Sequence, residues 1–175
     1  MIDVTEKHAF FYTEWPSNFF RAPFDYKSMF NGETNHFFCT EQAFMHEKAL
    51  CFGDLVTARK ILSAMTPMAA KELGRTVKPF DTDEWEKHRY NVMLAVNLEK
   101  YRQNTEVALK LLDKRFDGRT FVEASPIDGI WGIRLPMGAP GIDDESNWRG
   151  RNLLGKAITE ARNILIHEAR NGTEV

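Results

Sequence analysis

The segment 8–38 constrains the fold most, because aromatic side chains crowd it and turn-forming residues interrupt it. Aromatic residues favour strands over helices. Pro16, Pro23 and Gly32 divide the segment into short pieces, and such residues mark turns between strands. The sequence therefore predicts short strands joined by turns in this part of the chain.

Helix signals dominate the rest of the chain. Thr40, Asp54 and Thr66 are suitable N-cap residues, and the run from Asp83 to Glu86 has the spacing of a capping box. The predicted helices are 41–50, 55–64, 67–74, 83–101, 105–112 and 152–170, with one further strand at 120–124. The apolar face of the helix 83–101 is formed by Trp85, Val92, Met93 and Val96.

Residues 125–150 show neither a helical nor a strand period, and they include the acidic trio Asp143, Asp144 and Glu145. Irregular segments of this length inside a compact domain are commonly lids or binding loops. No repeat or linker divides the chain. We therefore predict a single compact α+β domain over residues 1–175, predominantly helical, with short N-terminal strands and one long loop in the C-terminal half.

Composition excludes several classes of function. The chain has 23 basic and 25 acidic side chains and a net charge of -2, so a general polyanion-binding surface is not expected. Cys39 and Cys51 belong to no CxxC or Cys/His cluster, which predicts a reduced chain without a metal site. The N-terminus has no long apolar run, so we expect no signal peptide, no membrane span and a cytoplasmic location.

Glu41, Phe44, Met45 and Lys48 fall on one face of the helix predicted at 41–50, because seven residues are close to two helical turns. A carboxylate set among apolar groups has the raised pKa that suits proton transfer. The same spacing also fits an amphipathic helix whose Glu41 and Lys48 lie at the edge of the buried stripe.

Asp128, Trp131 and Gly132 form a second candidate site at the start of the long loop. An indole stacks on a planar ring or a sugar face, and glycine lets the backbone approach a ligand closely. The alternative is a turn that contributes a core tryptophan.

A third candidate is the run WRGRNLLG, residues 148–155, which enters the last predicted helix. Free N–H groups at a helix N-terminus, together with the guanidinium groups of Arg149 and Arg151, suit a phosphate. The two arginines fit solvated surface positions equally well.

Five motifs occur in the order and approximate spacing of one known family, and they extend over roughly residues 10–166. They are Ser17-Asn18-Phe19, Thr40 to Phe44 with Lys48-Ala49, Gly74-Arg75 with Trp85, Asp128 with Trp131-Gly132, and Gly150 to Gly155 with Arg162. On these residues the chain resembles the NADAR (YbiA-like) family, and the resemblance implies a YbiA-like fold.

The resemblance also implies an N-glycosidase that hydrolyses a ribose C1–N bond with no cofactor and no metal. Members of the family act on phosphorylated ribosylamine intermediates of riboflavin biosynthesis or on ADP-ribosylated guanine in nucleic acid. A small ribosylamine or an ADP-ribosylated nucleotide is therefore the expected partner. The alternative is a module that binds ADP-ribose or NAD without cleaving it. The oligomeric state is not predicted.

Carried over position by position, the resemblance makes Glu41, Lys48 and Asp128 the catalytic candidates. Glu41 and Asp128 divide the acid and base roles, or Lys48 forms an imine with C1. Asp128 and Trp131 are expected to form the second wall of the site. The substrate-binding candidates are Asn18, Phe19, Arg75, Trp131, Gly132, Arg134, Arg151 and Asn152.

Arg134 departs from the family pattern, in which a second small residue often follows the Trp-Gly pair. An arginine here fits a phosphate or pyrophosphate, which would favour a nucleotide-sized ligand. It also fits an ion pair with Asp143, Asp144 or Glu145 that only holds the loop.

Overall fold

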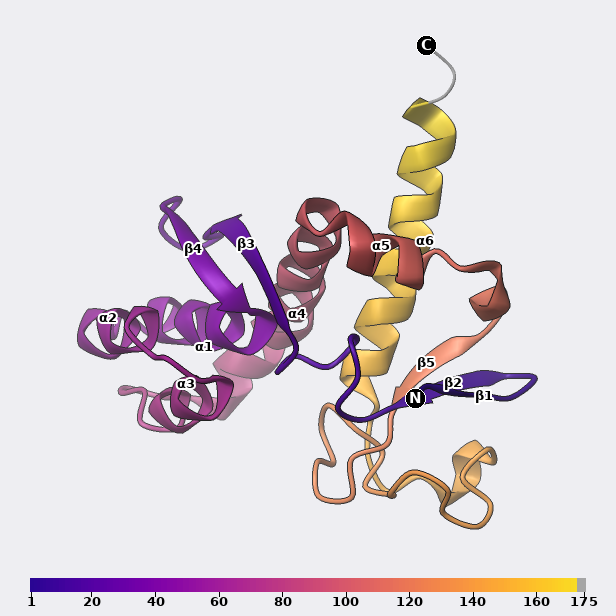
Figure 1. The fold of residues 1–175 in the computed structure, drawn as a ribbon. Coiled ribbons are helices and arrows are strands. Elements are labelled where there is room, and N and C mark those ends of the chain that lie inside the picture. The colour runs from indigo at the N-terminus through magenta and orange to yellow at the C-terminus, as the bar shows by residue number, and fades with distance from the viewer. Residues whose placement is uncertain (173–175) are drawn as a thin grey trace. The chain divides into compact units, whose positions relative to one another are not determined.

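The computed structural model describes residues 1–172, which form two compact units (Figure 1). The terminal unit comprises residues 1–17 and 106–172, and the central unit comprises residues 18–105. Each unit combines helices with a small sheet. The fold is therefore α+β, as predicted.

The central unit has an antiparallel strand pair and four helices. The strands face each other in a register that opposes Phe24 to Phe37, and successive residues of the first strand alternate between exposed and buried. The first helix packs against the other three and against the second strand (Figure 1). The elements are β3 (Arg21–Lys27), β4 (Thr34–Cys39), α1 (Thr40–Cys51), α2 (Leu55–Leu62), α3 (Pro67–Gly74) and α4 (Thr82–Gln103).

The terminal unit has a three-stranded sheet in the order β1-β2-β5, in which β2 and β5 run parallel. The last helix packs on β5, and the Trp15 ring lies 5.9 Å from that of Phe121 and 6.2 Å from that of Phe116. The elements are β1 (Asp3–Val4), β2 (His8–Phe11), α5 (Thr105–Leu111), η1 (Lys114–Phe116), β5 (Thr120–Glu123), η2 (Glu145–Asn147) and α6 (Leu153–Gly172).

Of the N-caps predicted at Thr40, Asp54 and Thr66, two are confirmed and one is wrong. The Asp54 side chain accepts the N–H of Thr57 at 3.0 Å, and Thr66 Oγ1 accepts that of Ala69 at 3.1 Å. Thr40, however, is the first residue of α1 and not its cap. Because β4 runs straight into α1, the residue before the helix is Cys39, still extended and with no capping side-chain bond.

The predicted N-cap of α4, Asp83, is also wrong, by two residues. Asp81 is the N-cap, and its carboxylate accepts the N–H of Glu84 at 2.7 Å. Asp81 and Glu84 have the same three-residue spacing as the box expected at Asp83, so two overlapping patterns competed for the helix start. The helix begins with the earlier pattern, directly after Asp81.

The apolar face expected on α4 is buried as predicted, but polar side chains are buried on the same helix: Arg89, Asn97 and Lys100. Complete burial lowers the pKa of Lys100 to about 7. The helix therefore carries buried charge that its hydrophobic pattern did not indicate.

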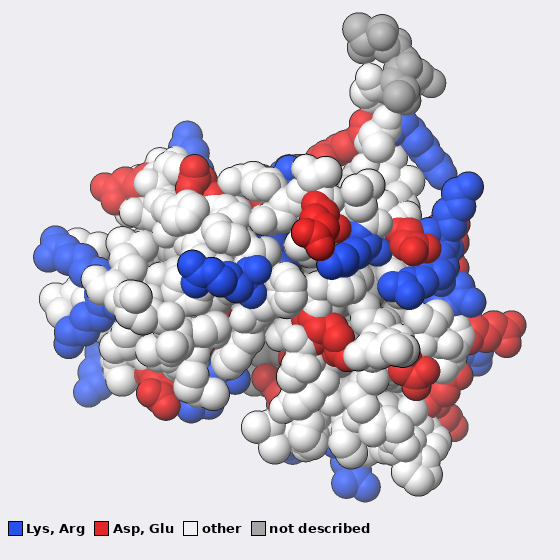
Figure 2. All heavy atoms as spheres, viewed as in Figure 1, with Lys and Arg blue, Asp and Glu red and all other residues white. Residues whose placement is uncertain are grey.

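Residues 125–150 form the predicted loop, apart from the short turn η2. On the face shown in Figure 2, basic and acidic side chains are interspersed, which fits the net charge of -2. Within residues 1–172, no helix combines the length and the apolar character needed to cross a bilayer.

Asp81→Ala is expected to lower the free energy of unfolding by about 1 kcal/mol, because the Glu84 N–H loses its acceptor. The matched control is Asp83→Ala, which removes an exposed carboxylate from inside the first turn and affects only the helix dipole, at about 0.3 kcal/mol. Urea unfolding measures both losses. Equal losses would contradict the assignment of Asp81 as the cap.

Candidate functional site

Glu41 lies in the first turn of α1 and is 6% exposed. Its backbone N–H donates to the carbonyl oxygen of Asn18 at 3.0 Å, so the segment before β3 is hydrogen-bonded to the N-terminal end of α1. The positive end of the helix dipole lies at the same place and favours a negative charge there. Because α1 is buried on most of its circumference, Glu41 does not lie on a polar helix face.

Lys48 lies two turns further along α1 and is partly buried. Its Nζ donates to the carbonyl oxygen of Gly74, at the end of α3, at 2.9 Å. The same nitrogen lies 4.5 Å from the centre of the Phe80 ring. At Gly74 the two helices are so close that an added Cβ would collide with the side chain of Met45.

The surroundings of Lys48 lower its pKa. Burial lowers the pKa of Lys48 below its usual range, and the positive charges of Arg89 and Arg75 lower it further, whereas Glu41 opposes them. A lysine with a lowered pKa has a larger fraction of nucleophilic free amine near neutral pH. Glu41, Lys48, Arg75 and Arg89 therefore form one group of interacting charges in the central unit.

Asn18, whose carbonyl oxygen accepts the N–H of Glu41, is 7% exposed. Its Nδ2 donates to Met93 Sδ at 3.3 Å, and its Oδ1 has no hydrogen-bond partner within residues 1–172. The ring of Phe19 lies 5.6 Å from Nζ of Lys71 on α3. Five of the predicted site residues, Asn18, Phe19, Glu41, Lys48 and Arg75, thus belong to the central unit.

The other six predicted residues belong to the terminal unit. Asp128 holds a turn there, because its Oδ1 accepts the N–H groups of Ile130 and Trp131, each at 2.8 Å. One carboxylate oxygen is therefore already engaged by the backbone. The catalytic role of Asp128, and the wall expected from it and Trp131, stay predictions.

Close backbone packing explains the glycines that follow. An added Cβ at Gly132 would lie 2.9 Å from the carbonyl oxygen of Glu123, and one at Gly150 would collide with the carbonyl oxygen of Gly132. Arg134 has a positive φ of 58° and is exposed. Its guanidinium lies against Gly129, so it covers the backbone of its own loop.

Asn152 is fully buried, and both ends of its side-chain amide are bonded to β5. Its Oδ1 accepts the N–H of Glu123 at 3.1 Å, and its Nδ2 donates to the carbonyl oxygen of Phe121 at 3.0 Å. The residue thus fixes the start of α6 on the strand, while Arg151 is exposed. Substrate contacts by either residue stay predictions, and the geometry of Asn152 supports a structural role.

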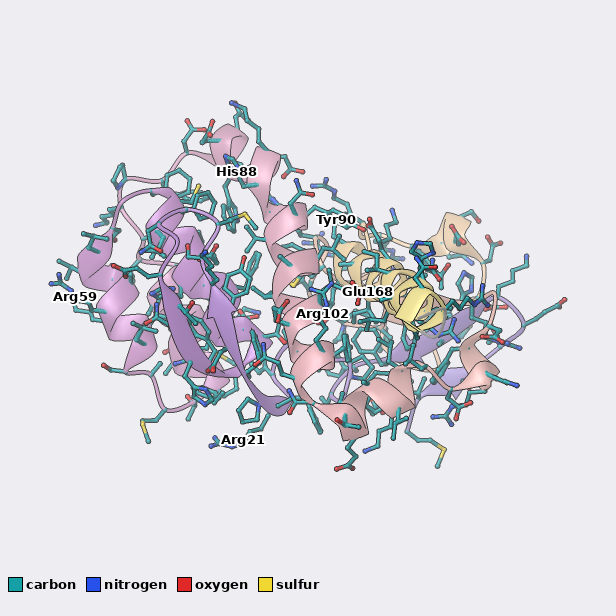
Figure 3. All side chains as sticks on the ribbon, turned by 90° about the horizontal axis from the view of Figure 1, so that it is seen from above. Arg21, Arg59, His88, Tyr90, Arg102 and Glu168 are labelled. Carbon is teal, nitrogen blue, oxygen red and sulfur yellow. The ribbon has the colours of Figure 1, made fainter. Side chains whose placement is uncertain are left out.

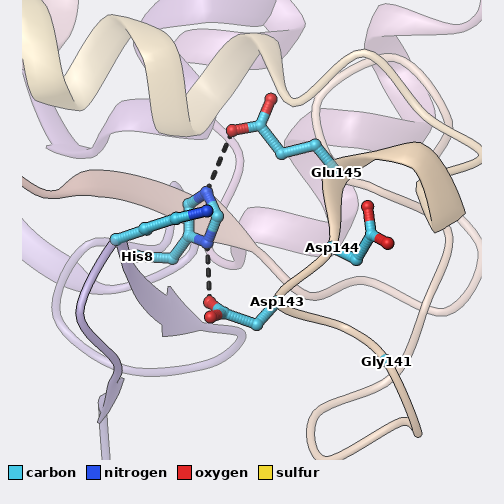
Figure 4. Close-up of a pocket in the computed structure, with 6 residues that line it drawn as sticks. His8, Gly141, Asp143, Asp144 and Glu145 are labelled. Carbon is cyan, nitrogen blue, oxygen red and sulfur yellow. Dashed lines mark hydrogen bonds and ion pairs between the residues drawn. The ribbon is translucent and has the colours of Figure 1, made fainter.

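A pocket in the terminal unit contains none of the predicted site residues (Figure 4). Nδ1 of the buried His8 lies 2.7 Å from Asp143 Oδ1, and its Nε2 lies 3.1 Å from Glu145 Oε1. A ring protonated at both nitrogens donates to both carboxylates. Two members of the acidic trio thus hold the long loop to β2 through His8. Within residues 1–172, no cluster of His, Cys, Asp and Glu is arranged to hold a metal ion.

The sequence patterns did not single out Arg89. A signal was present, because Arg89 lies four residues after Trp85 and four before Met93, inside the apolar stripe of α4. A charged side chain that is buried in such a stripe needs a partner of opposite charge or a ligand.

Comparison with known proteins agrees with the motifs. A family model described as NADAR domain matches residues 5–166. An N-glycosidase of Acanthamoeba polyphaga mimivirus is 37% identical over 141 residues, 80% of this chain and 82% of the relative. Protein irg-1 of Caenorhabditis elegans is 38% identical over 161 residues, 85% of this chain and 74% of the relative.

The fold also agrees with a solved structure. The NMR structure of the E. coli protein YbiA superposes with a TM-score of 0.70 at 26% identity, and the match covers 96% of this chain and 90% of YbiA. The expected YbiA-like fold is therefore confirmed.

Lys48 is expected to react with an amine acylating reagent at lower pH than a typical lysine, because only the unprotonated amine reacts and its pKa is lowered. Glu41→Gln should lower the pH midpoint further, since the carboxylate opposes the shift. Mass spectrometry of labelled peptides over a pH series measures this, with the exposed Lys60 as internal control. A midpoint at or above pH 10.5 would contradict the lowered pKa.

Proposed function

The chain belongs to the NADAR family, and on this premise we propose that it is an N-glycosidase that hydrolyses the bond between C1 of a ribose and a nitrogen atom. One observation carries the proposal: α1 holds both a buried carboxylate, Glu41, and Lys48, whose pKa is lowered. The mimivirus relative, 37% identical, is named an N-glycosidase, which supports the same reaction class.

The proposed substrate is a phosphorylated ribosylamine, either a riboflavin intermediate or ADP-ribosylated guanine. Both contain a ribose C1–N bond and a phosphate, and the cationic Arg75, whose charge acts on Lys48, suits a phosphate. On the face shown in Figure 2, charges of both signs are interspersed. This supports recognition of a nucleotide-sized group more than of a long run of nucleic-acid backbone.

In the first route, Glu41 acts on the ring-closed ribose. Breaking the C1–N bond leaves positive charge on C1 and the ring oxygen, and the carboxylate stabilises that charge. Glu41 then accepts a proton from the water that attacks C1, while the nitrogen of the base departs with the bonding pair and gains a proton. Asp128 Oδ1 is engaged by two backbone N–H groups, so the proposal gives the proton transfer to Glu41.

In the second route, Lys48 is the nucleophile. The N-glycoside opens to an imine as the ring oxygen gains a proton, and the free amine of Lys48 adds to C1. The base leaves as a protonated amine, and C1 stays joined to Lys48 as a new imine. Water then hydrolyses this imine to the free sugar aldehyde and restores the lysine. Glu41 transfers the protons in this route.

Glu41→Gln is expected to fold normally and to lower kcat by about 10²- to 10⁴-fold, because the amide cannot accept a proton. The assay incubates pure protein with riboflavin-pathway ribosylamines, ADP-ribosylguanosine and NAD, and follows the released base. The control is Glu72→Gln, an exposed position on α3.

Wild-type activity in Glu41→Gln would contradict the proposal that Glu41 transfers the proton. Tight binding of ADP-ribose by the wild-type protein, measured by calorimetry, with no product from any substrate would instead identify a binding module.

Borohydride trapping separates the two routes. During turnover, reduction of the imine should leave a stable sugar adduct on Lys48, identified by mass spectrometry, and Lys48→Ala should give no adduct and little activity. The matched control is Lys71→Ala, on the neighbouring α3, which should keep both. Full activity in Lys48→Ala would eliminate the imine route and leave the Glu41 route.

A further inference from the structure

Arg89 is a buried cation on α4 to which neither proposed route assigns a contact with the substrate. It is 7% exposed and lies in the same stripe as the buried Trp85 and Met93, one helical turn from each. His88 and Tyr90, its neighbours in the sequence, lie on different sides of α4 (Figure 3). The side of α4 that carries Arg89 is the side that carries Trp85 and Met93.

Contacts one turn before and one turn after Arg89 show what this side of α4 faces. The Trp85 ring lies 5.4 Å from that of Phe44, in the middle of α1. Met93 Sδ accepts from Asn18, whose carbonyl oxygen accepts the N–H of Glu41. Trp85 thus packs on α1 one turn before Arg89, and one turn after it Met93 contacts Asn18, the residue that is hydrogen-bonded to the start of α1. Arg89 lies between these two contacts, on the side of α4 that faces the helix of Glu41 and Lys48.

The guanidinium of Arg89 is only partly paired. Its Nη2 lies 2.5 Å from Glu86 Oε2, a carboxylate whose side chain is 40% exposed. Its Nε is buried and has no hydrogen-bond partner within residues 1–172. A buried N–H donor without an acceptor is costly to a folded protein, so this arginine is better suited to a ligand than to the fold alone.

We propose that Arg89 is a substrate-binding residue of the Glu41 and Lys48 site, and that its guanidinium binds a phosphate oxygen of the substrate. The inference rests on the proposed function and adds to it the residue that selects a phosphorylated ribose. A guanidinium donates two parallel hydrogen bonds to a phosphate, and burial strengthens them because little water competes.

Two further observations support a binding site at this place. The positive charge of Arg89 acts on Lys48 and contributes to its lowered pKa. Asn18 Oδ1 and Thr40 Oγ1, at the Glu41 end of α1, are also buried without hydrogen-bond partners within residues 1–172. An acceptor, a hydroxyl and a donor thus accompany Glu41 and Lys48, as the hydroxyls and the phosphate of a ribose phosphate require.

Calorimetry with the full chain tests the proposal without turnover, using ribose 5-phosphate, ADP-ribose, inorganic phosphate and ribose as probes. Wild-type protein should bind at least one phosphorylated sugar at least tenfold more tightly than ribose. Arg89→Met should lose at least tenfold in affinity for that sugar, and Arg89→Lys should keep part of it. Arg59→Met, an exposed arginine on α2 (Figure 3), is the control and should bind as the wild type does.

The comparison between ribose 5-phosphate and ADP-ribose shows whether a monophosphate or a pyrophosphate is bound. Wild-type affinity in Arg89→Met, or no preference of the wild type for phosphorylated sugars, would overturn the proposal.

If Arg89→Met does not fold, the NMR resonance of the Arg89 Nε–H in the wild type decides. The resonance should shift when ribose 5-phosphate or ADP-ribose is added, and an unchanged resonance at saturation would overturn the proposal.

The proposed function and the role of Arg89 can fail separately. Binding through Arg89 without cleavage of any substrate would refute the N-glycosidase function but not the binding site. Cleavage at the wild-type rate and substrate affinity in Arg89→Met would support the N-glycosidase function and refute the role of Arg89.

Discussion

The buried polar side chains of α1 determine how the central unit is assembled. Gln42 accepts the N–H of Phe38 at 3.0 Å and donates to the carbonyl oxygen of Ile61, also at 3.0 Å. Glu47 accepts the N–H of Met29 at 3.2 Å. One helix is thus bonded in several directions, to the strand that enters it, to α2 and to the turn between β3 and β4.

This arrangement fixes the rotation of α1 about its own axis, which apolar packing alone would fix less strictly. Turning the helix by one residue would leave Gln42 and Glu47 buried without partners, and that loss is costly. Burial already raises the pKa of Glu47. Glu41 and Lys48 are thereby held in one orientation, and the proposed reaction requires such preorganisation of its reacting groups.

Local patterns in the sequence predicted what local contacts determine. The caps at Asp54 and Thr66 bond within their own first turns, so residue type and spacing sufficed. The roles of Arg89 and Asn152 depend on partners or surroundings from other elements, and sequence spacing contains no such information. Asn152 shows a second limit: a residue can belong to a family motif because it holds a strand and a helix together, whether or not it meets a ligand.

Gly74 determines both how closely α3 packs on α1 and where the Lys48 amine is held. Its missing side chain allows α3 to lie against Met45, and its carbonyl oxygen accepts the bond from Lys48. A side chain at this position would force Met45 or α3 to move, and the acceptor that anchors the lysine would move with α3. The position of the amine therefore depends on a residue that has no side chain of its own. A substitution that alters how closely α3 approaches α1 therefore changes the position of the Lys48 amine, even when every charged residue stays the same.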